Sequence, residues 1–135
     1  MDVPYVRHVI KKQKTMDSKN QMQKREIKFR AWVIGMSQMF YHEEINYGHV
    51  LDYKEPHDDI NLMQFTGLHD KNSKEIYEGD IIRSHGHNYI VGYSECTFDI
   101  TNTTDADDTF YLFQEWYQDC IIIGNIYENP ELLKP

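Results

Sequence analysis

Residues 64–82 read Gln-Phe-Thr-Gly-Leu-His-Asp-Lys-Asn-Ser-Lys-Glu-Ile-Tyr-Glu-Gly-Asp-Ile-Ile, and the rest of the chain is organised around this segment. Phe65 closes an apolar run that Gly67 ends. The Asp-Lys-Asn-Ser segment at residues 70–73 is typical of a turn, because Asp and Asn side chains hydrogen-bond their own backbone. Gly79 permits the positive φ of a second break, after which Ile81 opens the next strand. The stretch predicts strand, turn, strand, turn, strand. It holds neither a nucleophile beside a base nor a phosphate loop.

The composition indicates one β-rich domain. The chain has 135 residues, of which 40% are hydrophobic and 13% aromatic, with ten tyrosines. This length suits a single domain, and aromatic side chains favour strands. No run of 18 apolar residues is present, so we expect no membrane span and no signal peptide. Two cysteines, Cys96 and Cys120, are too few for a disulfide scaffold, which favours a reducing, cytoplasmic location.

Charge is distributed unevenly along the chain. Residues 1–25 hold seven basic and two acidic residues, a net charge of +5, whereas residues 26–135 hold seven basic and twenty acidic residues, a net charge of −13. We expect residues 1–24 to form a flexible basic extension. The alternative is a basic arm that binds nucleic acid or a partner. The acidic body should repel nucleic acid at long range, so we expect no nucleic acid on it.

The segment at residues 27–33 alternates with period two, which predicts a half-buried strand. One face holds Ile27, Phe29, Ala31 and Val33, and the other holds Lys28, Arg30 and Trp32. We expect the first face to be buried and the second to meet solvent. Trp32 then either serves as a binding platform or packs under a loop or at a subunit contact.

The segment from Thr109 to Trp116 is strongly apolar and aromatic. Both of its faces look covered, which predicts a strand buried on two sides, in a barrel wall or at a subunit contact. Gly124 is expected to kink or bulge the following strand. Asn129 with Pro130 predicts a capped helical turn at the end. The candidate interaction surface consists of Trp32, Tyr111, Phe113 and Trp116.

Residue types that bind metals occur in several places, at residues 42–59, at His85 and His87 around the hairpin pivot Gly86, and at Asp105, Asp107 and Asp108. None of their spacings matches a zinc or calcium pattern. No Ser–His or Cys–His arrangement and no distinctive carboxylate pair occurs either. We therefore assign no metal, no cofactor and no catalytic residue.

The central stretch resembles the signature of the YopX family of phage and prophage proteins, through Phe-Thr-Gly-Leu and Asp-Lys-Asn at residues 65–72 and Glu-Ile-Tyr-Glu-Gly-Asp-Ile-Ile at residues 75–82. Two further motifs fit, Arg-Glu-Ile-Lys-Phe-Arg-Ala-Trp at residues 25–32 and Ile-Gly-Asn-Ile-Tyr-Glu-Asn-Pro-Glu-Leu-Leu at residues 123–133. The resemblance implies a small β-rich domain over residues 25–135, encoded by mobile elements and acting in the bacterial host, with no biochemical activity to carry over. Ser73 stands where the family's turn usually closes with Gly.

The pattern as a whole predicts an all-β fold of about seven to nine short antiparallel strands. We expect a small SH3-like barrel or a sandwich, with a short C-terminal helical turn.

Three classes of function compete. The first is a non-enzymatic interaction or assembly module, homo-oligomeric or bound to a host or phage protein. The second is a nucleic-acid-related protein, which binds through the basic arm or uses its acidic body as a decoy for a host DNA-binding protein. The third is an enzyme, which a deep pocket holding two carboxylates with divergent pKa values would support. We favour the first.

Overall fold

The fold is all-β, as predicted. The computed structural model describes residues 26–45, 59–112 and 118–134. Within these residues it has nine strands, three short 3₁₀ helices and no α-helix. The strands are β1 (Phe29–Val33), β2 (Gln38–Phe40), β3 (Ile60–His69), β4 (Glu75–Tyr77), β5 (Asp80–Ser84), β6 (His87–Ser94), β7 (Thr97–Asn102), β8 (Thr109–Tyr111) and β9 (Ile121–Asn125). The 3₁₀ helices are η1 (Ile34–Met36), η2 (His42–Glu44) and η4 (Pro130–Leu133).

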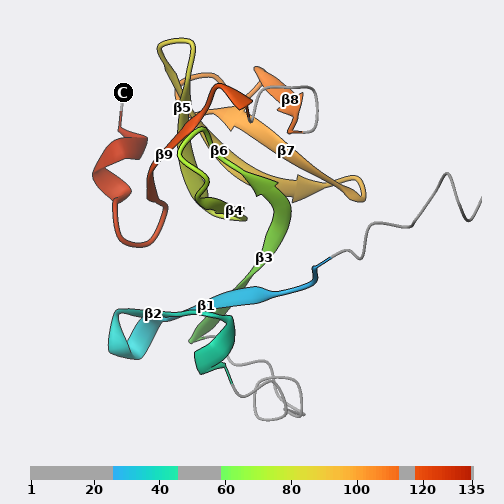
Figure 1. Ribbon diagram of the computed structural model, residues 1–135. Coiled ribbons are helices and arrows are strands. Elements are labelled where there is room, and N and C mark those ends of the chain that lie inside the picture. The colour runs from blue at the N-terminus through green and yellow to red at the C-terminus, as the bar shows by residue number, and fades with distance from the viewer. Residues whose placement is uncertain (1–25, 46–58, 113–117, 135) are drawn as a thin grey trace, which may run out of the picture.

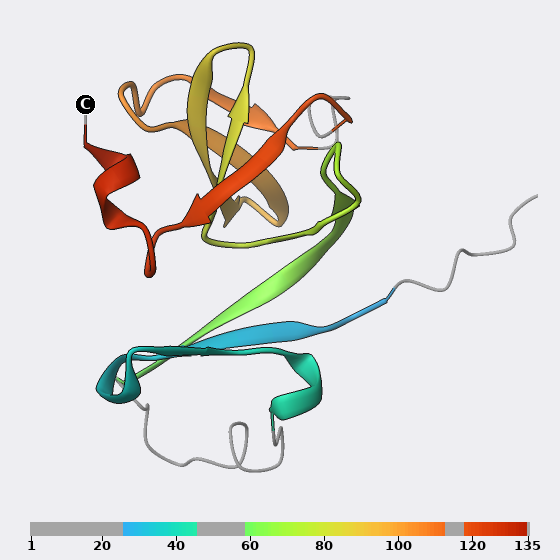
Figure 2. The ribbon, with the colours of Figure 1, turned by 60° about the vertical axis from the view of Figure 1, so that its left-hand side comes forward.

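The strands form two antiparallel sheets, of order β2-β1-β3-β4 and β8-β7-β6-β5-β9. Strand β3 belongs to the four-stranded sheet but links it to the other layer: its first half pairs with β1, and its last residues pair with β4, which lies against the five-stranded sheet (Figures 1 and 2). Gly67, expected to end the apolar run, does not end the strand. It lies inside β3 with φ +84°, where the register to β4 shifts, because a bulge lets the strand bend from one layer to the other.

The central stretch folds as predicted. Asp70 closes its turn, since one carboxylate oxygen accepts the N–H groups of Asn72 and Lys74. The other oxygen accepts the N–H of Ile122 at 2.9 Å, which ties the turn to β9. Ser73 and Gly79 both have positive φ, +64° and +79°. Ser73 therefore occupies a left-handed position that a glycine would fill without strain.

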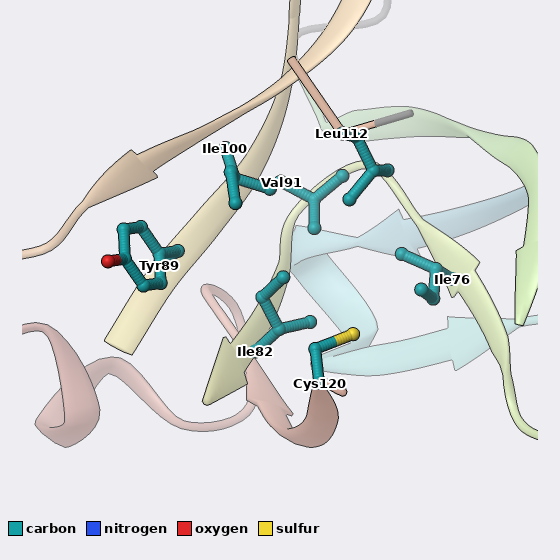
Figure 3. Close-up of a cluster of buried hydrophobic side chains, with 7 residues drawn as sticks. All are labelled: Ile76, Ile82, Tyr89, Val91, Ile100, Leu112 and Cys120. Atoms are coloured by element: carbon teal, nitrogen blue, oxygen red, sulfur yellow. The ribbon is translucent and has the colours of Figure 1, made fainter. Parts of the chain in front are cut away.

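The core lies inside the five-stranded sheet. Figure 3 shows its buried side chains, which are Ile76, Ile82, Tyr89, Val91, Ile100, Leu112 and Cys120. Ile76 comes from β4, so the central stretch contributes to this core as well as to the link between the layers.

Three predictions from the sequence need correction. At β1 and just before it, Ile27 is exposed, whereas Lys28 and Arg30 are buried because both cations have acidic partners on other strands. The described part of the segment from Thr109 is not covered on both faces within one chain, because β8 is an edge strand with Tyr111 exposed, and burial at a subunit contact stays a prediction. Asn129 does not cap η4, and its side-chain oxygen instead accepts the N–H of Asn125.

Two other predictions near the C-terminus are confirmed. The register between β5 and β9 shifts beside Gly124, as expected for a bulge. The final helical turn is the 3₁₀ helix η4.

Candidate functional site

A buried ion pair joins the two sheets. The Nη2 atom of Arg30, on β1, lies 2.7 Å from Oδ1 of Asp80, on β5. The same nitrogen donates to the carbonyl oxygen of Glu78 at 3.1 Å, and the guanidinium lies 4.9 Å from the ring centre of Tyr77. Both charged residues are almost fully buried, with exposed fractions of 4% and 2%. A pair desolvated to this extent depends strongly on both partners being present.

A second ion pair lies next to the first. Lys28 contacts Glu75 and also Glu26, the latter at 3.1 Å, and its ammonium lies 4.8 Å from the ring centre of Phe65. The hydroxyl of Tyr77 donates to the other oxygen of Glu75 at 2.9 Å. Tyr77 therefore touches both pairs. We call the set Lys28, Arg30, Glu75, Tyr77 and Asp80 the charge clasp.

The charge clasp explains why the sequence motifs occur together. The motif at residues 25–32 supplies its two cations, and the motif at residues 75–82 supplies its two carboxylates and its tyrosine. The glycine between these acids, Gly79, lets the chain turn from β4 into β5, so that Tyr77 can donate its backbone N–H to Asp80 at 2.8 Å. Within the described residues, Nε of Arg30 is the buried side-chain polar atom without a hydrogen-bond partner.

The pKa values of the two carboxylates in the clasp are shifted in opposite directions. Burial raises the pKa of Asp80, and the nearby Arg30 offsets that rise only in part. Burial also raises the pKa of Glu75, but its hydrogen bonds with Lys28 and Tyr77, together with nearby positive charge, lower it by more, so the pKa lies below its usual value. Burial and the hydrogen bond to Glu75 raise the pKa of the Tyr77 hydroxyl.

A pocket of about 430 Å³ opens beside the clasp and is lined by Arg30, Glu75 and Asp80 together with residues of β9. Two carboxylates with divergent pKa values thus share one pocket, the arrangement that would support an enzyme. Their oxygens, however, are occupied. Asp80 accepts from Arg30 and from the Tyr77 N–H, and Glu75 accepts from Lys28 and the Tyr77 hydroxyl. A general acid or base needs an oxygen within reach of substrate, so the clasp is suited to holding the sheets together.

The predicted interaction residues do not form one surface in the described part of the chain. Trp32 is half-buried and stacks on Tyr127, with ring centres 5.7 Å apart. Tyr111 is exposed on β8, at the edge of the other sheet. Phe113 and Trp116 lie outside the described residues. Whether any of the four binds a partner stays a prediction.

Sequence reasoning missed a different surface, the β1–β2 hairpin. Residues 31–41 contain no charged side chain. Ile34, Met36 and Tyr41 are exposed there by 50%, 62% and 45%, around strand β2 at the edge of its sheet. We call residues 31–41 the uncharged hairpin. The signal in the sequence was the absence of charge over eleven residues of an otherwise highly charged chain.

Within the described residues no three potential metal ligands lie close enough to hold an ion, and no helix is long and apolar enough to cross a membrane. His85 and His87 are exposed at the β5–β6 hairpin. Most of the candidate ligands at residues 42–59 lie outside the described residues.

Comparison with known proteins places these features in a family. The model of the YopX protein family matches residues 28–134. The structure is similar to that of protein EF1440 from Enterococcus faecalis, with 24% identity, a TM-score of 0.53, and coverage of 81% of this chain and 99% of that one. It is also similar to protein yopX from Bacillus subtilis, with 20% identity, a TM-score of 0.54, and coverage of 80% and 96%. At these identities the likeness concerns the fold. The search of curated proteins finds no match.

Proposed function

The chain belongs to the YopX family, and we propose that it acts as a non-enzymatic assembly module whose uncharged hairpin pairs with the same hairpin of a second copy. In keeping with the family resemblance, we place this module in the service of a phage or prophage. The proposal rests on one observation: a strongly acidic chain exposes apolar side chains around an edge strand that carries no charge.

Electrostatics favour this surface for self-association. Residues 26–135 have a net charge of −13, so two copies repel each other over most orientations. Contact is least unfavourable where no like charges face each other, and residues 31–41 provide such a place. Burying Ile34 and Met36 there removes apolar surface from water, at about 25 cal/mol per Å².

Backbone geometry favours the same surface. Among the residues that the structure describes, strand β2 pairs with β1 alone and lies at the end of its sheet. Edge strands that avoid pairing usually carry Lys, Pro or a covering segment, and β2 reads Gln-Met-Phe. Two identical edges can pair antiparallel about a two-fold axis, which makes the contact closed and symmetric. So short a strand predicts a weak dimer whose population depends on concentration.

The competing functions have less support. The carboxylate oxygens of the clasp are engaged with protein groups, which argues against acid–base catalysis there. The basic arm lies outside the described residues. The hypothesis that it binds nucleic acid has a separate test. Binding through phosphates would weaken steeply as salt rises and would disappear on deletion of residues 1–25.

Sedimentation equilibrium of the full chain tests the proposal, with Met36→Glu as the variant and Ile27→Glu as its matched control. The two side chains are 62% and 61% exposed, and each substitution adds one negative charge. Ile27 lies at the opposite end of β1 from the hairpin. We expect the wild type and Ile27→Glu to dimerise with similar affinity and Met36→Glu to dimerise at least tenfold more weakly. A strictly monomeric wild type at millimolar concentration, or equal effects of the two variants, would refute the proposal.

A further inference from the structure

A second pocket, of about 390 Å³, lies between the β5–β6 hairpin, the end of β7 and the C-terminal turn. Among the described residues, its ionisable lining side chains are those of Arg83, His87 and Lys134, and no carboxylate side chain lines it. This is unusual in a segment with a net charge of −13, where basic residues number seven against twenty acidic ones. The pocket gathers two of those seven cations in one place.

Both cations are available to a ligand. Within the described residues, neither Arg83 nor Lys134 forms an ion pair, whereas Lys28 and Arg30 are both committed to carboxylates. Arg83 donates from Nε to the side-chain oxygen of Asn88 at 3.0 Å. That bond fixes the plane of the guanidinium and leaves its two terminal nitrogens for other acceptors.

Neutral donors complete the lining. Because the Asn88 oxygen accepts from Arg83, its NH₂ group remains as a donor, and Thr103 contributes a hydroxyl. Asn102 is partly committed: its NH₂ group donates one hydrogen bond to Asp108 at 2.9 Å, and its oxygen accepts from Thr104. Asp108 is thus hydrogen-bonded to Asn102, which lines the pocket, but Asp108 is not itself one of the lining residues.

We propose that this pocket binds the phosphate group of a small molecule. Arginine matches phosphate oxygens with two parallel hydrogen bonds, and a second cation with neutral donors can satisfy the remaining oxygens. A doubly charged group makes fuller use of two cations than a single carboxylate does. The acidic surface around the pocket disfavours an extended nucleic-acid backbone, but it is screened beyond about 8 Å at physiological ionic strength and admits a small anion.

Titration of the full chain followed by amide NMR shifts tests the proposal, with inorganic phosphate and a nucleoside 5′-monophosphate as separate probes. We expect saturable shifts centred on residues 86–88 and 102–104. Arg83→Gln should weaken binding about tenfold or more, as loss of a hydrogen bond to a charged group implies, and Lys134→Gln should weaken it as well. The control Lys71→Gln, an exposed cation away from this pocket, should leave affinity within about twofold of the wild type.

The two probes distinguish the source of the phosphate. Equal affinities mean that the phosphate group alone is recognised, and tighter binding of the monophosphate means that the organic part is recognised as well. Shifts that do not saturate, shifts centred elsewhere, or equal losses in Arg83→Gln and Lys71→Gln would overturn the proposal. Binding of a single-stranded oligonucleotide but of neither small probe would overturn it too.

Discussion

Replacing Arg30 with Met should destabilise the protein in a way that depends on pH. The substitution keeps a long side chain over Tyr77 but leaves the Asp80 carboxylate, 2% exposed, without its cation. Asp80 would still accept the N–H of Tyr77 at 2.8 Å, so the loss is chiefly one of charge compensation. Breaking one side of a buried ion pair typically costs about 3–5 kcal/mol.

The size of this loss has an upper limit set by protonation. A buried carboxylate can escape its penalty by binding a proton, which at pH 7 costs about 4 kcal/mol for a group whose unfolded pKa is near 3.9, at 1.36 kcal/mol per unit. Burial already raises the pKa of Asp80, and without Arg30 it rises further. A carboxyl group whose pKa is higher in the folded than in the unfolded chain stabilises the fold at low pH, and this stabilisation is lost as pH rises. The penalty should therefore shrink by up to about 2.7 kcal/mol between pH 7 and pH 5.

Urea unfolding followed by tryptophan fluorescence measures the effect, because Trp32 stacks on Tyr127 only in the folded chain. The control is the double variant Arg30→Met/Asp80→Asn. It removes both charges, keeps an acceptor for the Tyr77 N–H, and should recover most of the stability at pH 7, with a smaller change between pH 7 and pH 5 than Arg30→Met shows. The reasoning fails if Arg30→Met costs less than about 1 kcal/mol at pH 7, or if its cost is the same at pH 5.

Three further outcomes follow from local geometry. Ser73→Gly should raise the free energy of unfolding by about 0.5–1 kcal/mol in urea melts, because it relieves a left-handed backbone at φ +64°. Gly124→Ala should lower the thermal midpoint, since a Cβ there would lie 2.5 Å from the Asn129 oxygen, whereas Gly35→Ala, with open space around it, should not. Burial raises the pKa of Cys120 from 9.0 to about 11. The neutral thiol therefore makes its full contribution to the free energy of unfolding below pH 9, and loses roughly 2–3 kcal/mol of it as pH rises toward 11. Cys120→Ala should reduce this loss in alkaline unfolding curves.

Local chemistry made the central stretch predictable. The turn that Asp70 closes and the break at Gly79 depend on residues next to each other in sequence, so the order of strands and turns from residues 64 to 82 could be read directly. The bulge at Gly67 could not, because a glycine with positive φ ends a strand or bends it depending on which strands pair with it.

The buried face of β1 and the ion pairs of the charge clasp could not be predicted from local sequence in the same way. Period two shows which residues share a face but does not say which face is buried. Arg30 is buried because Asp80, fifty positions later in the chain, compensates its charge, and no local pattern shows that partner. Likewise the exposed edge of β2 is defined by the sheet order, although the lack of charge over residues 31–41 was visible.

The most direct measurement of self-association is amide hydrogen exchange of the full chain at two protein concentrations that bracket the dimerisation midpoint. Pairing of two copies through the uncharged hairpin predicts that the amides of β2 become more protected at the higher concentration, while those of β8, an edge strand of the other sheet, do not change. Unchanged protection of β2 at a concentration where sedimentation shows a dimer would contradict the account, because the contact would then lie elsewhere on the molecule.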